Sequence, residues 1–173
     1  MGCTADQVQE GLESYQGMKW RTEIVEADGI LILNDSYNAN PVSASASLRL
    51  LHDWDNSRSH RRVAVLGDML ELGASGTQSH RQLGREAVRL GVELLVAVGY
   101  FAPEVVGSAV EEGLPAECAV AAGDVDEACA ELYPRLESDD MVLVKGSRRV
   151  GLERMVDYIC SRRKDRMPAG GEG

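Results

Sequence analysis

Short runs of apolar residues recur along the chain, and segments with helical periodicity lie between them. The runs cover residues 30–33, 63–66, 94–98, 118–120 and 141–144. They are continuous rather than alternating, which is typical of strands that are covered on both faces. A chain that alternates such strands with helices folds as a parallel α/β sheet. This pattern constrains the fold more than any other feature of the sequence.

Helical periodicity predicts helices over residues 42–54, 76–90, 102–112, 126–136 and 149–161. Upstream, the turn Ala27-Asp28-Gly29 separates two strand-like segments and indicates a hairpin. We therefore predict an α/β, Rossmann-like three-layer domain over residues 17–162, with a mostly parallel sheet and one antiparallel edge strand. The flanking segments are predicted to be a helix within residues 1–16 and a disordered tail over residues 163–173.

The composition argues against two classes of partner. The 173 residues carry a formal net charge of -10, whereas phosphate backbones and anionic lipid surfaces require a basic face. No apolar run approaches the ~20 residues of a membrane-spanning helix, so we expect neither nucleic-acid binding nor membrane insertion. The four cysteines form no C-x-x-C pair, so we expect no metal site and a reducing, cytoplasmic location.

Polar residues gather where the predicted strands end, and this edge of an open α/β sheet binds ligands. Asp35 follows the first apolar run, where a carboxylate can accept hydrogen bonds from the hydroxyls of a ribose. Tyr37 offers a flat face for a base. Lys145 and Arg148 lie at the end of the last strand and the start of the next helix, so both can meet a phosphate or a carboxylate.

The sequence leaves the roles of three other residues at this edge open. Asp68 and Glu71 follow the second apolar run, and they can either hold an amine or a cation, or cap a helix. His80 lies on the next predicted helix and can face the cleft, but its spacing fixes no acidic partner, so we assign no general base. No G-x-x-x-x-G-K-[ST] loop occurs in the sequence. Any use of ATP therefore requires another domain.

Three segments stand out at the ends of the predicted strands. They are NDSYNANP, VAVLGDMLELG followed by a histidine, and VLVKGSR. Together they resemble the C-terminal domain of the Mur ligase family, and the similarity runs over about residues 4–160. Within that family they are most similar to the ligases that join D-alanyl-D-alanine to UDP-N-acetylmuramoyl-tripeptide. The resemblance implies that residues 1–16 end a central ATPase domain, and that the fragment is inactive without its missing N-terminal and central domains.

The resemblance also assigns roles to single residues. It implies that Asp35 binds the ribose of ATP and that Arg21 reaches the terminal phosphate. The residues that it places in the same nucleotide loop are Tyr37, Asn38 and Asn40. The residues that it turns toward the dipeptide are Asp68, Glu71, His80, Lys145 and Arg148. The implied reaction is ATP-driven amide formation through an acyl phosphate, with Mg²⁺ held mainly by the central domain.

Two alternatives remain open at the level of the sequence. One is the C-terminal domain of a folylpolyglutamate synthase-like ligase, which shares the domain plan. The other is a non-catalytic α/β binding or regulatory module of the receiver type, because Asp35, Asp68 and Lys145 loosely match its acidic cluster and lysine. The asparagine-rich loop has no use in a receiver, which favours the ligase interpretation.

Overall fold

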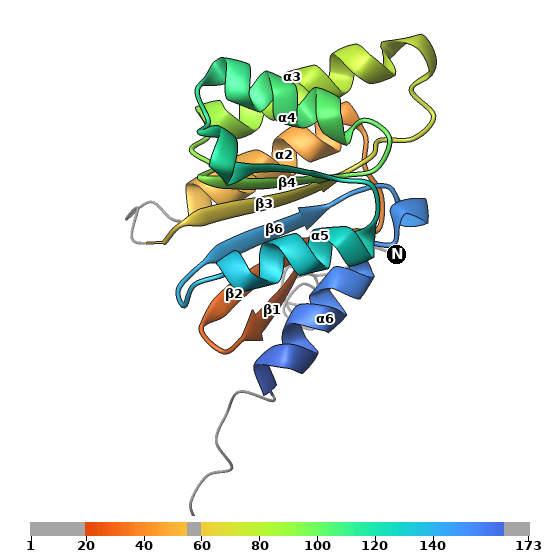
Figure 1. Ribbon diagram of the computed structural model, residues 1–173. Coiled ribbons are helices and arrows are strands. Elements are labelled where there is room, and N and C mark those ends of the chain that lie inside the picture. Colours follow the sequence, from red (N-terminus) through yellow and green to blue (C-terminus); the bar gives the residue numbers. More distant parts are fainter. Residues whose placement is uncertain (1–19, 55–59, 165–173) are drawn as a thin grey trace, which may run out of the picture.

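The computed structural model describes residues 20–54 and 60–164, and they form a three-layer α/β domain (Figure 1). Its six-stranded sheet has the strand order β1-β2-β6-β3-β4-β5. The predicted segment 1–16 lies outside the described residues, as does residue 165 onward of the predicted tail. The last helix continues to Lys164, two residues beyond the predicted end of the domain at residue 162.

The prediction of a mostly parallel sheet with one antiparallel edge strand is confirmed. The strands are β1 (Glu23–Ala27), β2 (Ile30–Asp35), β3 (Arg62–Gly67), β4 (Leu94–Val98), β5 (Ala119–Ala122) and β6 (Met141–Lys145). Only β1 runs antiparallel to its neighbour within the described sheet. The helices are α2 (Pro41–Trp54), α3 (Gly76–Arg89), α4 (Ala102–Glu112), α5 (Val125–Leu132) and α6 (Glu153–Lys164).

Three predicted boundaries were wrong. The helix predicted over residues 126–136 ends at Leu132, because Pro134 lies in the following 3₁₀ turn and cannot donate to an α-helical hydrogen bond. The helix predicted over residues 149–161 begins only at Glu153, because Gly151, with a φ of 78°, ends a separate 3₁₀ turn before it. The strand predicted over residues 118–120 is β5, which is shifted toward the C-terminus.

The continuous apolar runs supply two cores at once. In β3, Val63 and Val65 face the core under α5 and α6, whereas Ala64 and Leu66 face the core under α2, α3 and α4. Figure 1 shows these two helical layers on opposite faces of the sheet. Successive side chains of a strand point to opposite faces, so a strand that is covered on both sides must be apolar at every position.

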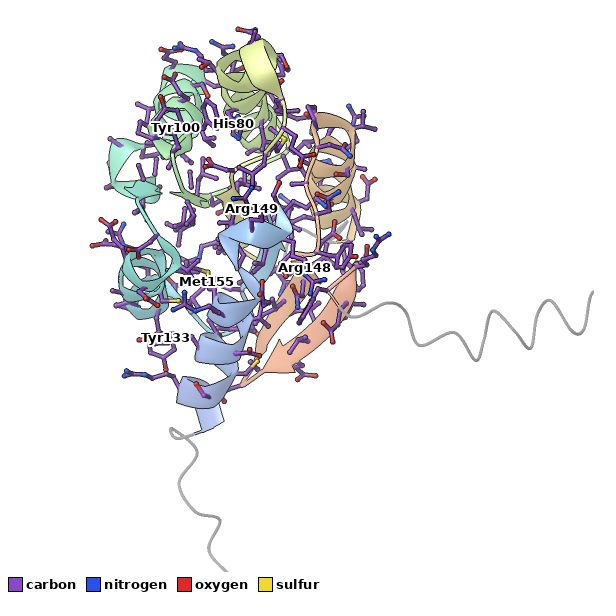
Figure 2. The ribbon with its side chains drawn as sticks, turned by 90° about the vertical axis from the view of Figure 1, so that its right-hand side faces the viewer. His80, Tyr100, Tyr133, Arg148, Arg149 and Met155 are labelled. Atoms are coloured by element: carbon purple, nitrogen blue, oxygen red, sulfur yellow. The ribbon has the colours of Figure 1, made fainter. Side chains whose placement is uncertain are left out.

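The topology creates a crevice beside β6. The neighbouring strands β2 and β6 are parallel, but α2 then packs on one face of the sheet and α6 on the other. Ligands of open α/β sheets bind outside the carboxyl ends of such strands. The arrowheads of the parallel strands point to one side in Figure 1, and Figure 2 looks onto that edge. Within residues 20–54 and 60–164, no helix has both the length and the apolar character to cross a membrane.

Candidate functional site

The first cavity opens at the carboxyl ends of β2 and β6, and we call it the β2–β6 pocket. It has a volume of about 310 Å³. Its lining residues are Arg21, Thr22, Asp35, Tyr37, Asn38, Asn40, Ser43 and Lys145. The structure thus brings together every residue predicted for the nucleotide site. Lys145 also lines this pocket, although the sequence analysis assigned it to the dipeptide.

A buried ion pair forms the floor of the β2–β6 pocket. Asp35 and Lys145 are register partners at the ends of adjacent parallel strands. The Lys145 Nζ lies 2.7 Å from Asp35 Oδ2, and the two side chains are 4% and 15% exposed. The same ammonium donates to the carbonyl oxygen of Asn38 over 2.6 Å. Lys145 therefore positions both the carboxylate and the asparagine-rich loop.

The Asp35 carboxylate keeps capacity for a ligand. Its Oδ2 accepts a second hydrogen bond from the Ser47 hydroxyl at 2.6 Å. Among the described residues, its Oδ1 accepts only the backbone N–H of Thr22, across a long 3.3 Å. Because a carboxylate oxygen can accept two hydrogen bonds, Oδ1 can take another donor from the pocket.

The Tyr37 ring supports positive charge rather than an open face for a base. The Arg21 guanidinium lies 4.3 Å from the ring centroid and the Arg148 guanidinium 5.3 Å from it. Arg148 is also 5.3 Å from the ring of Trp20. A cation over an aromatic ring is attracted by the negative potential of its face. Arg148 therefore lies beside Tyr37 and the β2–β6 pocket, apart from Asp68 and Glu71, with which it was predicted to bind the dipeptide.

The two asparagines of the loop shape the start of α2. Asn40 Oδ1 accepts from the backbone N–H of Ser43 at 2.9 Å, and the Ser43 hydroxyl accepts from the N–H of Asn40 at 3.1 Å. This reciprocal pair is an N-cap, and Pro41 occupies the first helical position, where its missing N–H costs nothing. Asn38 Oδ1 accepts from the N–H of Ala39. The loop is thus ordered by turn chemistry while its outer edge lines the pocket.

A second cavity, the β3–β5 pocket, opens beyond the ends of β3, β4 and β5. It has a volume of about 480 Å³. Its lining residues are Asp68, Leu70, Glu71, Val98, Gly99, Gly123, Asp124, Val125, Arg149, Val150 and Arg154. Of the residues predicted for the dipeptide, Asp68 and Glu71 line this pocket, whereas Lys145 and Arg148 do not. The sequence interpretation missed Arg149, although the adjacent pair Arg148-Arg149 after the last strand was a visible signal.

Asp68 acts as a cap in this structure. Its carboxylate accepts hydrogen bonds from the backbone N–H groups of Tyr100 and Phe101 at 2.8 and 3.0 Å. These N–H groups precede α4. Of the two roles that the sequence left open for Asp68, binding a cation or capping a helix, the structure therefore shows the helix cap. Glu71, in contrast, is exposed and makes no such contact within the part of the chain that the structure describes.

His80 is buried rather than directed into the cleft, so that prediction was wrong. Its side chain is 1% exposed and stacks on the Phe101 ring at a centroid distance of 4.2 Å. Its Nε2 accepts from the backbone N–H of Met69 at 2.9 Å, and its Nδ1 lies 2.7 Å from the carbonyl oxygen of Gly76. These contacts require the neutral tautomer that carries its proton on Nδ1. His80 therefore holds the loop after β3 in place.

The fold and the two charged pockets define a ligand-binding α/β domain with its sites at the carboxyl edge of the sheet. The sequence profile of one family, described as Mur ligase, glutamate ligase domain, matches residues 20–148. The chain belongs to this family.

Similar proteins agree with this assignment. The UDP-N-acetylmuramoyl-tripeptide--D-alanyl-D-alanine ligase of Mycobacterium tuberculosis (strain H37Rv) is 35% identical over 182 residues, covering 92% of this chain and 35% of the relative. A crystal structure of MurF from Acinetobacter baumannii superposes with a TM-score of 0.80 at 29% identity, covering 92% of this chain and 34% of that one. The chain thus spans about a third of the length of these relatives.

Two more distant structures share the fold. MurF ligase from Thermotoga maritima in complex with ADP has a TM-score of 0.69 and 24% identity, covering 92% of this chain and 37% of that one. The bifunctional folylpolyglutamate synthase/dihydrofolate synthase from Yersinia pestis, complexed with AMPPNP and Mn ion, has a TM-score of 0.59 and 18% identity, covering 91% and 35%. The chain is therefore less similar to the folylpolyglutamate synthase than to the MurF ligases.

Proposed function

We propose that this chain is the C-terminal domain of an ATP-dependent ligase that joins D-alanyl-D-alanine to UDP-N-acetylmuramoyl-tripeptide. Family membership and the activity for which the Mycobacterium tuberculosis relative is named support the ligase class and the substrates. The observation that carries the proposal is the β2–β6 pocket, because all the residues with nucleotide roles line one cavity built on the Asp35–Lys145 pair. We also propose a cytoplasmic location, because the proposed reaction uses a UDP-linked precursor and ATP.

The chemistry of the β2–β6 pocket fits a nucleotide. Asp35 Oδ1 has capacity for a ribose hydroxyl, and Arg21 and Arg148 supply positive charge beside it for phosphate groups. The Thermotoga maritima MurF ligase was solved in complex with ADP, which supports nucleotide use by the proposed ligase as a whole. Mg²⁺, when bound, neutralises charge on the phosphates. Within residues 20–54 and 60–164, no three His, Cys, Asp or Glu side chains come together as metal ligands, so in this proposal the other domains hold the ion.

In this proposal the chain positions reactants rather than breaking bonds itself. Lys145 fixes the Asp35 carboxylate and the Asn38 carbonyl, so the nucleotide loop needs little rearrangement on binding. The second pocket holds the incoming amine next to the nucleotide. Holding two reactants in place and excluding water lowers the barrier to amide formation.

The nucleotide half of the proposal is tested by titrating the ¹⁵N-labelled chain with ATP. We expect amide shifts at Thr22, Asn38 and Asn40, and weaker binding in the Asp35→Asn variant, which keeps the size of the side chain. Shifts confined to other parts of the surface, or an unchanged affinity in the variant, argue against the assignment.

The receiver-type alternative makes a different prediction. A receiver accepts a phosphoryl group on its strand-end aspartate, so incubation with acetyl phosphate should add one phosphoryl group to Asp35. We expect no gain in intact mass, because Asp68, the second acid of the supposed receiver cluster, lies in the β3–β5 pocket and caps α4 instead of lying beside Asp35. A stable phosphoryl adduct at Asp35 would favour the regulatory module.

A further inference from the structure

The β3–β5 pocket is lined by both signs of charge. Its acidic residues are Asp68, Glu71 and Asp124, and its basic residues are Arg149 and Arg154. A cavity of about 480 Å³ falls within the range of small-molecule sites. A lining with charges of both signs suits a small ligand that carries one positively and one negatively charged group. It suits a nucleotide poorly, because the phosphates of a nucleotide carry only negative charge.

Three of these five charged residues are already engaged. The Arg154 guanidinium lies 2.6 Å from Asp126 Oδ1. Asp124 caps α5 by accepting from the N–H of Glu127 at 2.9 Å. Asp68 holds two backbone N–H groups at the start of α4. Their charges are therefore partly satisfied within the domain.

Glu71 and Arg149 are the exceptions in this pocket. Across residues 20–54 and 60–164, neither side chain forms an ion pair or a hydrogen bond, and the two are not paired with each other. Figure 2 shows Arg149 near the middle of this edge, above Arg148 and toward α3 and α4, whereas Arg148 lies toward β1 and β2. Of two successive arginines in one 3₁₀ turn, Arg149 thus lines the β3–β5 pocket, whereas Arg148 lies over the ring of Tyr37.

The backbone fixes the loop that carries Glu71 relative to the loop that carries Arg149. Glu71 adopts a φ of 69°, a left-handed conformation that a residue with a Cβ rarely takes and that persists where surrounding contacts impose it. The loop of Glu71 is joined to the loop of Arg149 by two hydrogen bonds. Leu70 N–H donates to the Ser147 hydroxyl at 3.0 Å, and Ser147 N–H donates to the Asp68 carbonyl at 3.0 Å.

We propose that Arg149 and Glu71 determine acceptor specificity by binding the two ends of a zwitterionic peptide, the carboxylate at Arg149 and the ammonium group at Glu71. A guanidinium binds a carboxylate through two parallel hydrogen bonds, which fixes the orientation of the ligand. This inference rests on the proposed ligase function, whose acceptor, D-alanyl-D-alanine, is such a zwitterion. It assigns the carboxylate to Arg149 rather than to Lys145 or Arg148, which lie on the nucleotide side.

The test compares three ligands on the folded chain by ¹⁵N NMR titration: D-alanyl-D-alanine, its C-terminal amide and its N-acetyl derivative. We expect the wild-type chain to prefer the parent dipeptide over both analogues, with shifts around Glu71 and Arg149. The Arg149→Gln variant should bind the parent dipeptide with about tenfold lower affinity than the wild-type chain, since a charge-assisted pair is lost. It should bind the parent dipeptide no better than the C-terminal amide. Glu71→Gln should lose the preference for the free amine over the N-acetyl derivative and keep the preference for the carboxylate.

Two controls separate recognition from folding. Arg149→Lys keeps the charge and should retain part of the carboxylate preference. Arg162→Gln removes an arginine that lies over Tyr158 near the C-terminal end of α6 and should leave all three affinities unchanged. A carboxylate preference that survives in Arg149→Gln, or the absence of dipeptide shifts at this pocket, overturns the inference. Because ATP binding is read separately at the β2–β6 pocket, that result can occur while the proposed nucleotide site stands.

Discussion

Replacing Asp35 with alanine tests the ion pair beneath the β2–β6 pocket. The substitution removes the carboxylate that lies 2.7 Å from Lys145 Nζ and leaves an ammonium group that is 4% exposed. It also removes the acceptor of the Ser47 hydroxyl. We therefore expect Asp35→Ala to reduce stability as well as nucleotide binding.

The magnitude follows from the surroundings of the pair. Removing one partner of a fully buried pair costs about 3–5 kcal/mol, because the other charge is left uncompensated. The Asp35 side chain is 15% exposed, and Lys145 keeps its hydrogen bond to the Asn38 carbonyl. Both features reduce the cost, so we expect a loss of about 2–3 kcal/mol. For a domain of this size that corresponds to a fall of about 5–10 °C in Tm.

Urea unfolding followed by far-UV circular dichroism measures this loss, and a double-mutant cycle isolates the pair. Lys145→Met should cost less than Asp35→Ala, because Asp35 keeps Ser47, the Thr22 N–H and some contact with water. The double variant should be more stable than the sum of the single losses predicts, by about 1 kcal/mol or more. A loss below about 0.5 kcal/mol in Asp35→Ala, or strictly additive losses, would refute the reasoning.

Three further predictions concern the rest of the domain. His80→Ala removes the acceptor of a buried N–H and a stacked ring, so chemical denaturation should show a loss of about 2–4 kcal/mol; a smaller effect would deny it a positioning role. Gly84→Ala would drive a Cβ into the backbone of α4 and cost about 1–3 kcal/mol, whereas Gly107→Ala meets no atom and should stabilise by about 0.5–1 kcal/mol. Equal effects in those two variants would contradict this packing. Burial raises the pKa of the Cys129 thiol from 9.0 to about 11, so the thiol stays protonated to a higher pH in the folded chain than in the unfolded chain. Stability should therefore fall by on the order of 1–2 kcal/mol between about pH 9 and about pH 11, and Cys129→Ala should show a shallower fall.

Local patterns in the sequence predicted much of the fold and the nucleotide loop. The apolar runs predicted the central strands, since strands covered on both faces have no polar positions. The periodicity of residues 42–54 predicted α2, which the structure begins one residue earlier, at Pro41, after the N-cap Asn40. Asp35 was located because a carboxylate at a strand end is a local feature of the chain.

Long-range pairing is what the sequence did not reveal. The Asp35–Lys145 pair depends on the insertion of β6 between β2 and β3, and no local pattern encodes that strand order. The opposite placement of Arg148 and Arg149 depends on a 3₁₀ turn where a continuous helix was predicted. The burial of His80 depends on α4, which brings Phe101 over its ring.

The central claim is that this domain completes a D-alanyl-D-alanine-adding ligase. The direct measurement fuses the chain behind the first two domains of the Mycobacterium tuberculosis relative and follows ADP release. The account predicts ADP release that requires both UDP-N-acetylmuramoyl-tripeptide and D-alanyl-D-alanine and that is lost in the fusion carrying Asp35→Asn. A folded fusion that binds ATP but releases no ADP with these substrates, or that releases ADP without the dipeptide, would contradict the account.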